Sequence, residues 1–371
     1  MTSRQNEHQP EHDVPAAPGN QTKPLIIRER KKRKQKWTAK RIVLTVVIAL
    51  AVALVLAVAA YALSVYQSGK NMQVADDVSV EAPSTAISYT EGQTVEYNGH
   101  TYTLNKSIVS LVFMGIHVDS DEYQDSANGQ ADAVMALAID SSTGKITVIS
   151  IPRDSMVDVD TYSSSGAYTG IQNMQLCLAY NYGDDDNASA QNVASAVSRA
   201  LYSMPMNYYY AIDISGVGPM ADAIGGVPLT ALSSIPGTDI DEGEGVILTG
   251  DNAKAYVQYR DTTVLDSAID RQERQKQFVN AFVKQAMSRA QGNAGDLVNL
   301  FGIAQEYSTT NLGITEFTYL ATIMLNNGVD EVSAVTLGGE TVQGASGYAE
   351  YHLDRDAVYQ TVLDVFYTQT S

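Results

Sequence analysis

SIVSLVFMGI (residues 107–116), ADAVMALAID (131–140) and KITVISI (145–151) are three apolar stretches that predict the central strands of the protein. The first is almost continuously apolar, which is typical of a strand covered on both faces of a sheet. The second and third are separated by a Ser-Ser-Thr-Gly turn and read as a hairpin beside the first strand. We therefore predict a central, buried sheet that starts at residue 107.

Helices and strands alternate after this sheet core. Apolar residues recur at helical or strand spacing, which predicts six helices and two further strands. The helices are expected near 187–202, 216–224, 272–290, 295–306, 314–326 and 354–366, and the strands near 206–214 and 331–337. Strands interleaved with helices indicate an α/β protein, which we expect to be a layered α-β-α sandwich with a central mixed sheet.

The N-terminal region has the pattern of a membrane anchor. Residues 28–41, RERKKRKQKWTAKR, are densely basic, and residues 42–63 that follow carry no charge. An apolar helix of this length spans roughly 33 Å, enough for a bilayer core of about 30 Å. A cleavable signal peptide is the alternative, but the apolar run is long and starts late. We predict a single transmembrane helix over 42–63, with the N-terminus in the cytoplasm and the rest outside.

Four regions are expected along the chain. Residues 1–41 form a disordered, basic cytoplasmic tail, and 42–63 form the span. Residues 64–106 form a stalk and an accessory hairpin, because TVEYNGHTYTL has an Asn98-Gly99 turn between alternating runs. Residues 107–371 form the main extracytoplasmic domain. The lone Cys177 excludes an intramolecular disulfide framework and suits a small buried side chain.

Charge restricts the possible partners. The net charge of −18 argues against nucleic acid, which needs an extended basic surface. The five histidines show no zinc-ligand spacing. Residues 42–371 hold 13 Lys and Arg but 38 Asp and Glu, so any cluster of cations in this part of the chain is unusual.

Such a cluster lies in LTGDNAKAYVQYRDTTVLDSAIDRQERQKQF (248–278), which reads as a short and a long helix around an acidic loop. Arg271 and Arg274 share one helical face with Gln275. Guanidinium groups on one face form a fork of donors that suits phosphate. The alternative is a solvated helix surface whose arginines pair with nearby acidic residues.

Two further charged positions lie at strand ends. The predicted strand 145–151 ends in Ser-Ile, and Pro152, Arg153 and Asp154 follow it directly. Open α/β sheets place ligand sites at such strand ends. A structural Arg-Asp pair that closes the loop remains the alternative. Asp132 lies at the head of an apolar strand, where a carboxylate is unfavourable unless it is paired or bound to a metal ion.

The ordered set of motifs resembles the LytR-CpsA-Psr family of cell-wall glycopolymer transferases over roughly residues 107–285. The motifs are LVFMGI, QADAVMALAID, ISIPRDSMVDV, LCLAYNYGD, SRALYSMPMNYYYAIDISGVGPMADAIGGVPL and LTGDNAKAYVQYRD followed by DRQERQKQF. The resemblance implies a membrane-anchored phosphotransferase of cell-wall assembly, and an extracytoplasmic domain without disulfides is compatible with a Gram-positive surface. Such an enzyme moves a glycopolymer from a polyprenyl-pyrophosphate carrier to the C6 hydroxyl of N-acetylmuramic acid in peptidoglycan. It uses Mg²⁺, binds pyrophosphate through arginines and holds the isoprenoid in an apolar tunnel.

Carried over position by position, the resemblance implies roles for seven residues. The catalytic positions are Arg153, Asp132 and Arg260. The pyrophosphate-binding positions are Arg260, Arg271, Arg274 and Gln275. The metal ligands are Asp132 and, by a shift in the loop, Asp119. Two apolar stretches, MADAIGGVPL (220–229) and FVNAFVKQAM (278–287), line a lipid tunnel or else form ordinary core.

The chain also departs from the family pattern. His117 stands where the family has an acid, Gln258 and Gln130 stand at or near arginine positions, and Ala268 stands where an aspartate is common. These departures leave open a second function, that of a catalytically weak polyprenyl-phosphate-binding or regulatory module of the cell envelope.

Overall fold

The computed structural model describes residues 39–117, 129–261, 263, 267–292, 295–327 and 332–370. The chain divides into two compact units, Met1–Ala57 and Val58–Ser371. Most of the predicted basic tail and the predicted metal ligand Asp119 lie outside the described residues.

Helix α1 (Ala39–Met72) contains the predicted span 42–63. Among the described residues it is the one helix long and apolar enough to cross a membrane, over Leu50–Met72. Near its C-terminal end, the Tyr61 hydroxyl lies 2.9 Å from that of Thr318 in helix α7 (Ile314–Asn327). Ser68 donates to the hydroxyl of Thr315 at 3.0 Å. The first part of the predicted stalk is therefore the end of α1, and it packs on α7.

A six-stranded mixed sheet forms the centre of the larger unit, as the sequence predicts. Its strands lie in the order β12-β9-β4-β5-β6-β13. Strands β4, β5 and β6 are antiparallel neighbours, β9 runs parallel to β4, and β13 runs parallel to β6. The bounds are β4 (Ile108–His117), β5 (Gln130–Asp140), β6 (Ile146–Ile151), β9 (Tyr208–Asp213), β12 (Ser308–Thr310) and β13 (Val332–Thr336).

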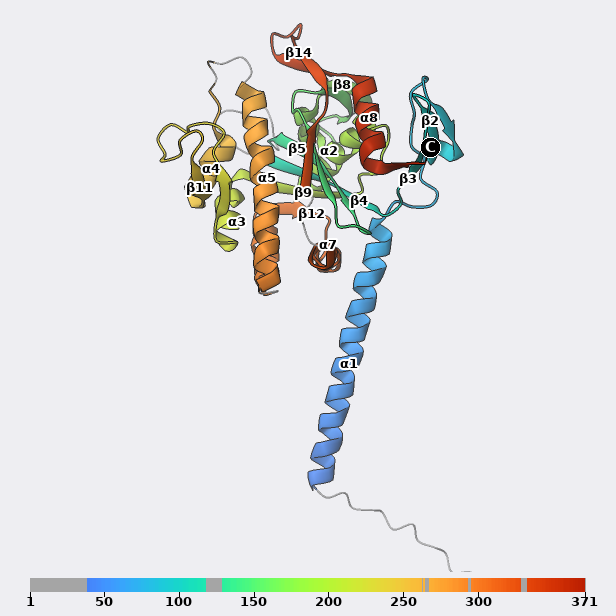
Figure 1. The fold of residues 1–371 in the computed structure, drawn as a ribbon, viewed down its shortest axis with the longest axis vertical. Helices are drawn as coiled ribbons and strands as arrows, with labels where there is room; N and C mark the ends of the chain where they lie inside the picture. Colours follow the sequence, from blue (N-terminus) through green and yellow to red (C-terminus); the bar gives the residue numbers. More distant parts are fainter. Residues whose placement is uncertain are drawn as a thin grey trace, which may run out of the picture. The chain divides into compact units, whose positions relative to one another are not determined.

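Helices cover both faces of this sheet (Figure 1), which confirms the layered α-β-α sandwich. Side chains of β4 alternate between the faces, as strand geometry requires. Val112 and Met114 join one core cluster with helices α2 (Asp186–Ala200) and α8 (Arg355–Phe366). On the other face, Leu111 packs in a cluster with residues of α7, while helices α3 (Val217–Ala223), α4 (Gly250–Gln258), α5 (Ser267–Gly292) and α6 (Gly295–Glu306) supply a neighbouring one.

The termini of two helices on the first face are set by aspartate caps. The Asp185 carboxylate accepts from the backbone N–H of Ala188 and caps α2, which begins at Asp186. Asp354 accepts from the N–H groups of Asp356 and Ala357 at the start of α8. Each cap satisfies backbone donors that have no partner within the helix.

The predicted hairpin at Asn98-Gly99 is confirmed. Strands β2 (Thr94–Tyr97) and β3 (His100–Leu104) pair across these two residues, whose φ values of 50° and 81° are those of a primed turn. Strand β1 (Ile87–Tyr89) adds to one side and the C-terminal strand β16 (Tyr367–Gln369) to the other. The boundary at residue 106 stays a prediction, although strands from both sides of it share this sheet.

Three small hairpins are not predicted from the sequence. They are β7 (Met156–Tyr162) with β8 (Tyr168–Gln175), β10 (Val227–Thr230) with β11 (Gly245–Leu248), and β14 (Gly339–Gln343) with β15 (Ala349–Leu353). β8 and β14 are largely exposed, so neither has a clear apolar alternation to read. Cys177 lies buried after β8, as predicted, and burial raises the pKa of its thiol to about 11.

Candidate active site

Arg153 and Asp132 meet where β5 begins and β6 ends. The two strands are antiparallel, and Val134 pairs with Ile151, so residues 132 and 153 follow as neighbours. Nη1 of Arg153 forms an ion pair with Oδ1 of Asp132. Its Nη2 donates to Oε1 of Gln130 at 3.0 Å, and its Nε lies 3.4 Å from Oδ1 of Asp154. The carboxylate at the strand head is thus paired, which offsets its desolvation.

Arg271 approaches the same carboxylate from helix α5. Its Nη1 lies 3.5 Å from Oδ2 of Asp132, and the arginine is only 8% exposed. Asp132 therefore lies between two guanidinium groups, one from a strand end and one from a helix. The structure brings together three of the predicted site residues, from segments more than a hundred positions apart.

Two glutamines hold α5 against its neighbours beside these charges. Nε2 of Gln275 donates to the carbonyl oxygen of Val257 in α4 at 3.1 Å. Nε2 of Gln272 donates to the hydroxyl of Ser150, near the end of β6, at 2.7 Å. Gln272 and Ser150 line a polar pocket together with the charged residues, and no signal in the sequence marks either as a site residue.

Arg274 contacts the C-terminal end of helix α4. Its Nε donates to the carbonyl oxygen of Tyr256 at 3.0 Å, Nη1 donates to the hydroxyl of Ser233 at 3.0 Å, and Nη2 donates to the carbonyl oxygen of Tyr259. Carbonyl groups at the end of a helix lack intrahelical donors, and Arg274 supplies them for α4. These contacts give Arg274 a role in packing α4 against α5, and it lines neither of the two spaces next to Asp132; its role in pyrophosphate binding stays a prediction.

Arg260 borders this centre. Nε of Arg260 donates to the hydroxyl of Ser267 at 3.1 Å, and its exposed side chain borders the polar pocket. Lys276 pairs with Glu273 and also contacts Thr336. The side chains of His117 and Ala268 lie outside those that the structure describes.

The charged residues form a small polar pocket of about 50 Å³. It is bordered by Asp132, Arg153, Arg260, Arg271 and Gln275. Further parts of its wall come from β5, β6, the segment after β6 and α5, and the hairpin β14–β15 adds Thr341, Ala349 and Tyr351.

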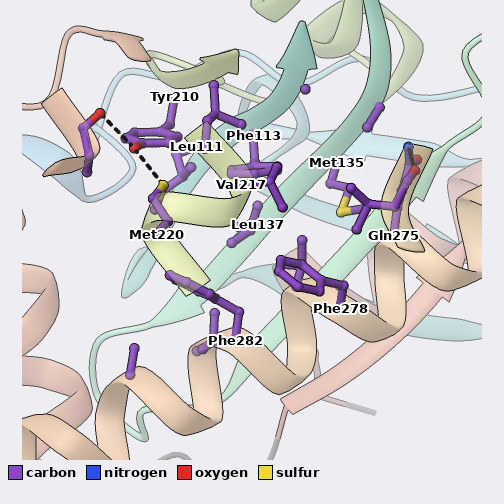
Figure 2. Close-up of a pocket in the computed structure, with 18 of the residues that line it drawn as sticks. Leu111, Phe113, Met135, Leu137, Tyr210, Val217, Met220, Gln275, Phe278 and Phe282 are labelled. Atoms are coloured by element: carbon purple, nitrogen blue, oxygen red, sulfur yellow. Dashed lines mark hydrogen bonds between the residues drawn. The ribbon is translucent and has the colours of Figure 1, made fainter. Parts of the chain in front are cut away.

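A larger, apolar cavity of about 280 Å³ lies between the sheet and helices α3, α5, α6 and α7. Figure 2 shows Phe278 and Phe282 of α5 facing Leu111, Leu137 and other side chains of the sheet. The predicted tunnel stretch 278–287 supplies six of the lining residues, whereas the stretch 220–229 supplies Met220 alone. Tyr210 also lines the cavity, and its hydroxyl donates to the carbonyl oxygen of Ala304 at 3.1 Å.

The two spaces share a wall. Asp132, Ala133, Met135, Arg271 and Gln275 line both, so the apolar cavity ends at the charged pocket. Such an arrangement suits an amphiphile whose long apolar part lies in the cavity and whose anionic head contacts the arginines.

The described residues offer little for a metal ion by themselves. Among them, no group of three or more His, Cys, Asp and Glu side chains is arranged to hold one. The carboxylates that border the polar pocket are Asp132 and Asp154, and both contact Arg153. Mg²⁺ often takes only one or two carboxylates and completes its shell with substrate phosphates and water, so Asp132 remains compatible with such an ion.

Comparisons with known proteins point to one family. A family model described as the LytR_cpsA_psr family matches residues 61–363. A polyisoprenyl-teichoic acid–peptidoglycan teichoic acid transferase, TagU of Halalkalibacterium halodurans, is 31% identical over 181 residues, which cover 48% of this chain and 53% of that protein. Biofilm regulatory protein A of Streptococcus mutans is 22% identical over 251 residues, which cover 64% of this chain and 58% of that protein. The chain thus matches a little over half the length of these relatives.

The fold has solved counterparts. The crystal structure of Bacillus subtilis TagV aligns with a TM-score of 0.54 at 21% identity and covers 70% of this chain and 98% of that one. At this identity the likeness bears on the fold, and it agrees with the mixed sheet between helical layers.

Proposed function

Because the chain belongs to the LytR-CpsA-Psr family, we propose that it transfers a glycopolymer from a polyprenyl-pyrophosphate carrier to N-acetylmuramic acid of peptidoglycan. The observation that carries this proposal is the shared wall between the apolar cavity and the arginine-lined pocket. A lipid diphosphate has the same two parts in the same order. The TagU relatives, named as teichoic acid transferases to peptidoglycan, support the reaction class.

In this proposal the isoprenoid occupies the apolar cavity and the diphosphate binds Arg153 and Arg271. The acceptor hydroxyl oxygen attacks the phosphorus that carries the polymer. A bond forms between the acceptor oxygen and this phosphorus, and the P–O–P bond to the carrier breaks. Polyprenyl monophosphate leaves, and the hydroxyl proton passes to solvent. Fixed guanidinium groups stabilise the negative charge that spreads over the phosphoryl oxygens. Asp132 holds both arginines in position through its two oxygens.

We propose Mg²⁺ as the cofactor, with Asp132 and Asp119 as its protein ligands. When bound, the ion neutralises charge on the diphosphate. A chelator is then expected to stop transfer, and added Mg²⁺ to restore it.

The proposed location is the cell membrane, with α1 as a single-pass anchor and the cytoplasm on its N-terminal side. The basic residues before the span favour this orientation. Protease added to intact protoplasts is expected to digest the chain beyond residue 63. Full protection of that part from the protease would contradict this orientation.

A second function, a weakly catalytic module that binds polyprenyl phosphates, is favoured by two neutral side chains. Gln258 lines the cavity near the arginines, and Gln130 accepts from Arg153 without adding charge. The likeness to a biofilm regulatory protein is in keeping with this alternative. A module of this kind binds the donor but releases no polyprenyl monophosphate.

The test is a transfer assay with the full chain in detergent. Lipid-linked donor and peptidoglycan are supplied, and polymer in the peptidoglycan fraction is measured together with polyprenyl monophosphate. The proposed enzyme yields both products in equal amounts. Tight donor binding with neither product would support the binding module and contradict the transferase.

A further inference from the structure

The outer wall of the polar pocket comes from the far end of the chain. Thr341, Ala349 and Tyr351 of the hairpin β14–β15 line this pocket. Among the described residues that line the apolar cavity, none belongs to this hairpin. The hairpin therefore lies on the side of the pocket that the lipid does not enter.

Strand β15 of the hairpin is fixed to the segment after β6 that carries Arg153. The backbone N–H of Tyr351 donates to the carbonyl oxygen of Asp154 at 2.8 Å, and Ser155 forms a parallel bridge with Tyr351. The Tyr351 hydroxyl donates to the carbonyl oxygen of Leu337 at 3.0 Å. Gln175 of β8 donates to the carbonyl oxygen of Ala349 at 2.6 Å. These contacts set the distance between the hairpin and the arginines.

Strand register separates the side chains of the hairpin into two faces. Thr341 pairs with Tyr351 and Gln343 with Ala349, so these four side chains share the face that borders the pocket. The intervening residues Glu340, Val342, Glu350 and His352 lie on the opposite face. The pocket-facing side thus presents an exposed hydroxyl and an exposed amide in a row, while the acidic side chains of the hairpin point the other way.

In the proposed binding mode, the sugar of a glycosylated lipid diphosphate lies next to Thr341 and Gln343. Its lipid end lies in the cavity, so the sugar on the other phosphate leaves through the polar pocket. The polar pocket, at about 50 Å³, is much smaller than the apolar cavity, at about 280 Å³, so a donor whose diphosphate contacts the arginines extends its sugar beyond the pocket. The surface it meets there carries Thr341 and Gln343.

We propose that the hairpin β14–β15 recognises the first sugar of the donor, with Thr341 and Gln343 as its specificity-determining residues. The proposal rests on the function proposed above. A hydroxyl and an amide each donate and accept hydrogen bonds, which suits the hydroxyl and acetamido groups of a hexosamine. Neutral side chains also avoid repulsion of the adjacent diphosphate.

Two ligands and matched variants of the full chain test this inference. The ligands are a prenyl diphosphate and the same molecule carrying one N-acetylhexosamine, and the dissociation constant is measured for each. The double variant Thr341→Val with Gln343→Ala is expected to bind the sugar-bearing ligand about tenfold more weakly, because it loses one or two hydrogen bonds. Its affinity for the sugar-free ligand is expected to change much less, because Arg153 and Arg271 hold the diphosphate. Val342→Ala, on the opposite face, is the control and should affect neither.

Each other result overturns the inference in a distinguishable way. If the double variant binds both ligands as the unaltered protein does, the hairpin does not recognise the donor sugar. If the double variant binds both ligands normally but has a higher KM for peptidoglycan fragments, the hairpin binds the acceptor instead. If the unaltered protein binds neither ligand, the proposed function falls together with the inference.

Discussion

Replacing Arg271 by lysine is expected to lower donor turnover by about tenfold to a hundredfold, although the positive charge is kept. Arg271 is buried where the apolar cavity meets the polar pocket. There its planar guanidinium can contact Asp132 and donate hydrogen bonds to the diphosphate at the same time. A lysine ammonium is a point charge and cannot form the same fork. Losing one charged hydrogen bond costs about 1.5–3 kcal/mol, which corresponds to this range.

Matched variants on the same helix separate a site effect from a charge effect. Lys276→Ala removes a full charge but only disrupts contacts with Glu273 and Thr336, so turnover should stay near normal. Arg274→Lys should lower the melting temperature rather than affect turnover at matched stability, because Arg274 binds carbonyl groups of α4. Turnover is measured with lipid-linked donor for all three variants. Equal activity of Arg271→Lys and Lys276→Ala would show that the guanidinium of Arg271 does not act on the donor.

The position of Arg274 marks the limit of prediction from helical spacing. Arg271, Arg274 and Gln275 do share one side of α5, as the sequence indicates. That side is wide enough to face two neighbours, the strand end with Arg153 and the end of α4. Only the packing of α4 against α5 decides which arginine meets which, and a sequence does not contain that geometry.

The sheet core and its helices were predictable because burial imposes a period on their side chains. Strands β4, β5 and β6 are apolar runs, and the paired carboxylate of Asp132 stands out against such a background. The hairpin β14–β15 has exposed residues on both faces of β14, and so lacks this period. Its glycines at 344 and 347 mark a turn, but nothing in the sequence connects that turn to Arg153. The contribution of Thr341 and Tyr351 to the polar pocket depends on the tertiary fold.

Filling the apolar cavity is expected to abolish binding of a prenyl diphosphate without unfolding the protein. Ala286 of α5 is buried and lines the cavity, so Ala286→Phe places a ring in the space that the isoprenoid needs. The cavity accommodates the ring, so the melting temperature should fall little, whereas affinity should fall by at least a hundredfold. Each buried methylene of a lipid contributes about 0.8 kcal/mol, so displacing a few of them accounts for this loss.

The control is Ser288→Phe, which adds the same ring two residues later on the exposed side of α5. It should leave the affinity unchanged. Both dissociation constants are measured by titrating the full chain in detergent. Unchanged affinity in Ala286→Phe would place the lipid elsewhere.

The most direct test of a single amphiphile site is a titration of the unaltered full chain with three ligands. These are a prenyl diphosphate, the corresponding prenyl alcohol and inorganic diphosphate. Because the cavity and the polar pocket share Asp132, Arg271 and Gln275, the complete ligand should bind at least a hundredfold more tightly than either part, and each part should compete with it. If inorganic diphosphate binds as tightly as prenyl diphosphate, or if the alcohol fails to compete, the cavity and the pocket do not act as one site.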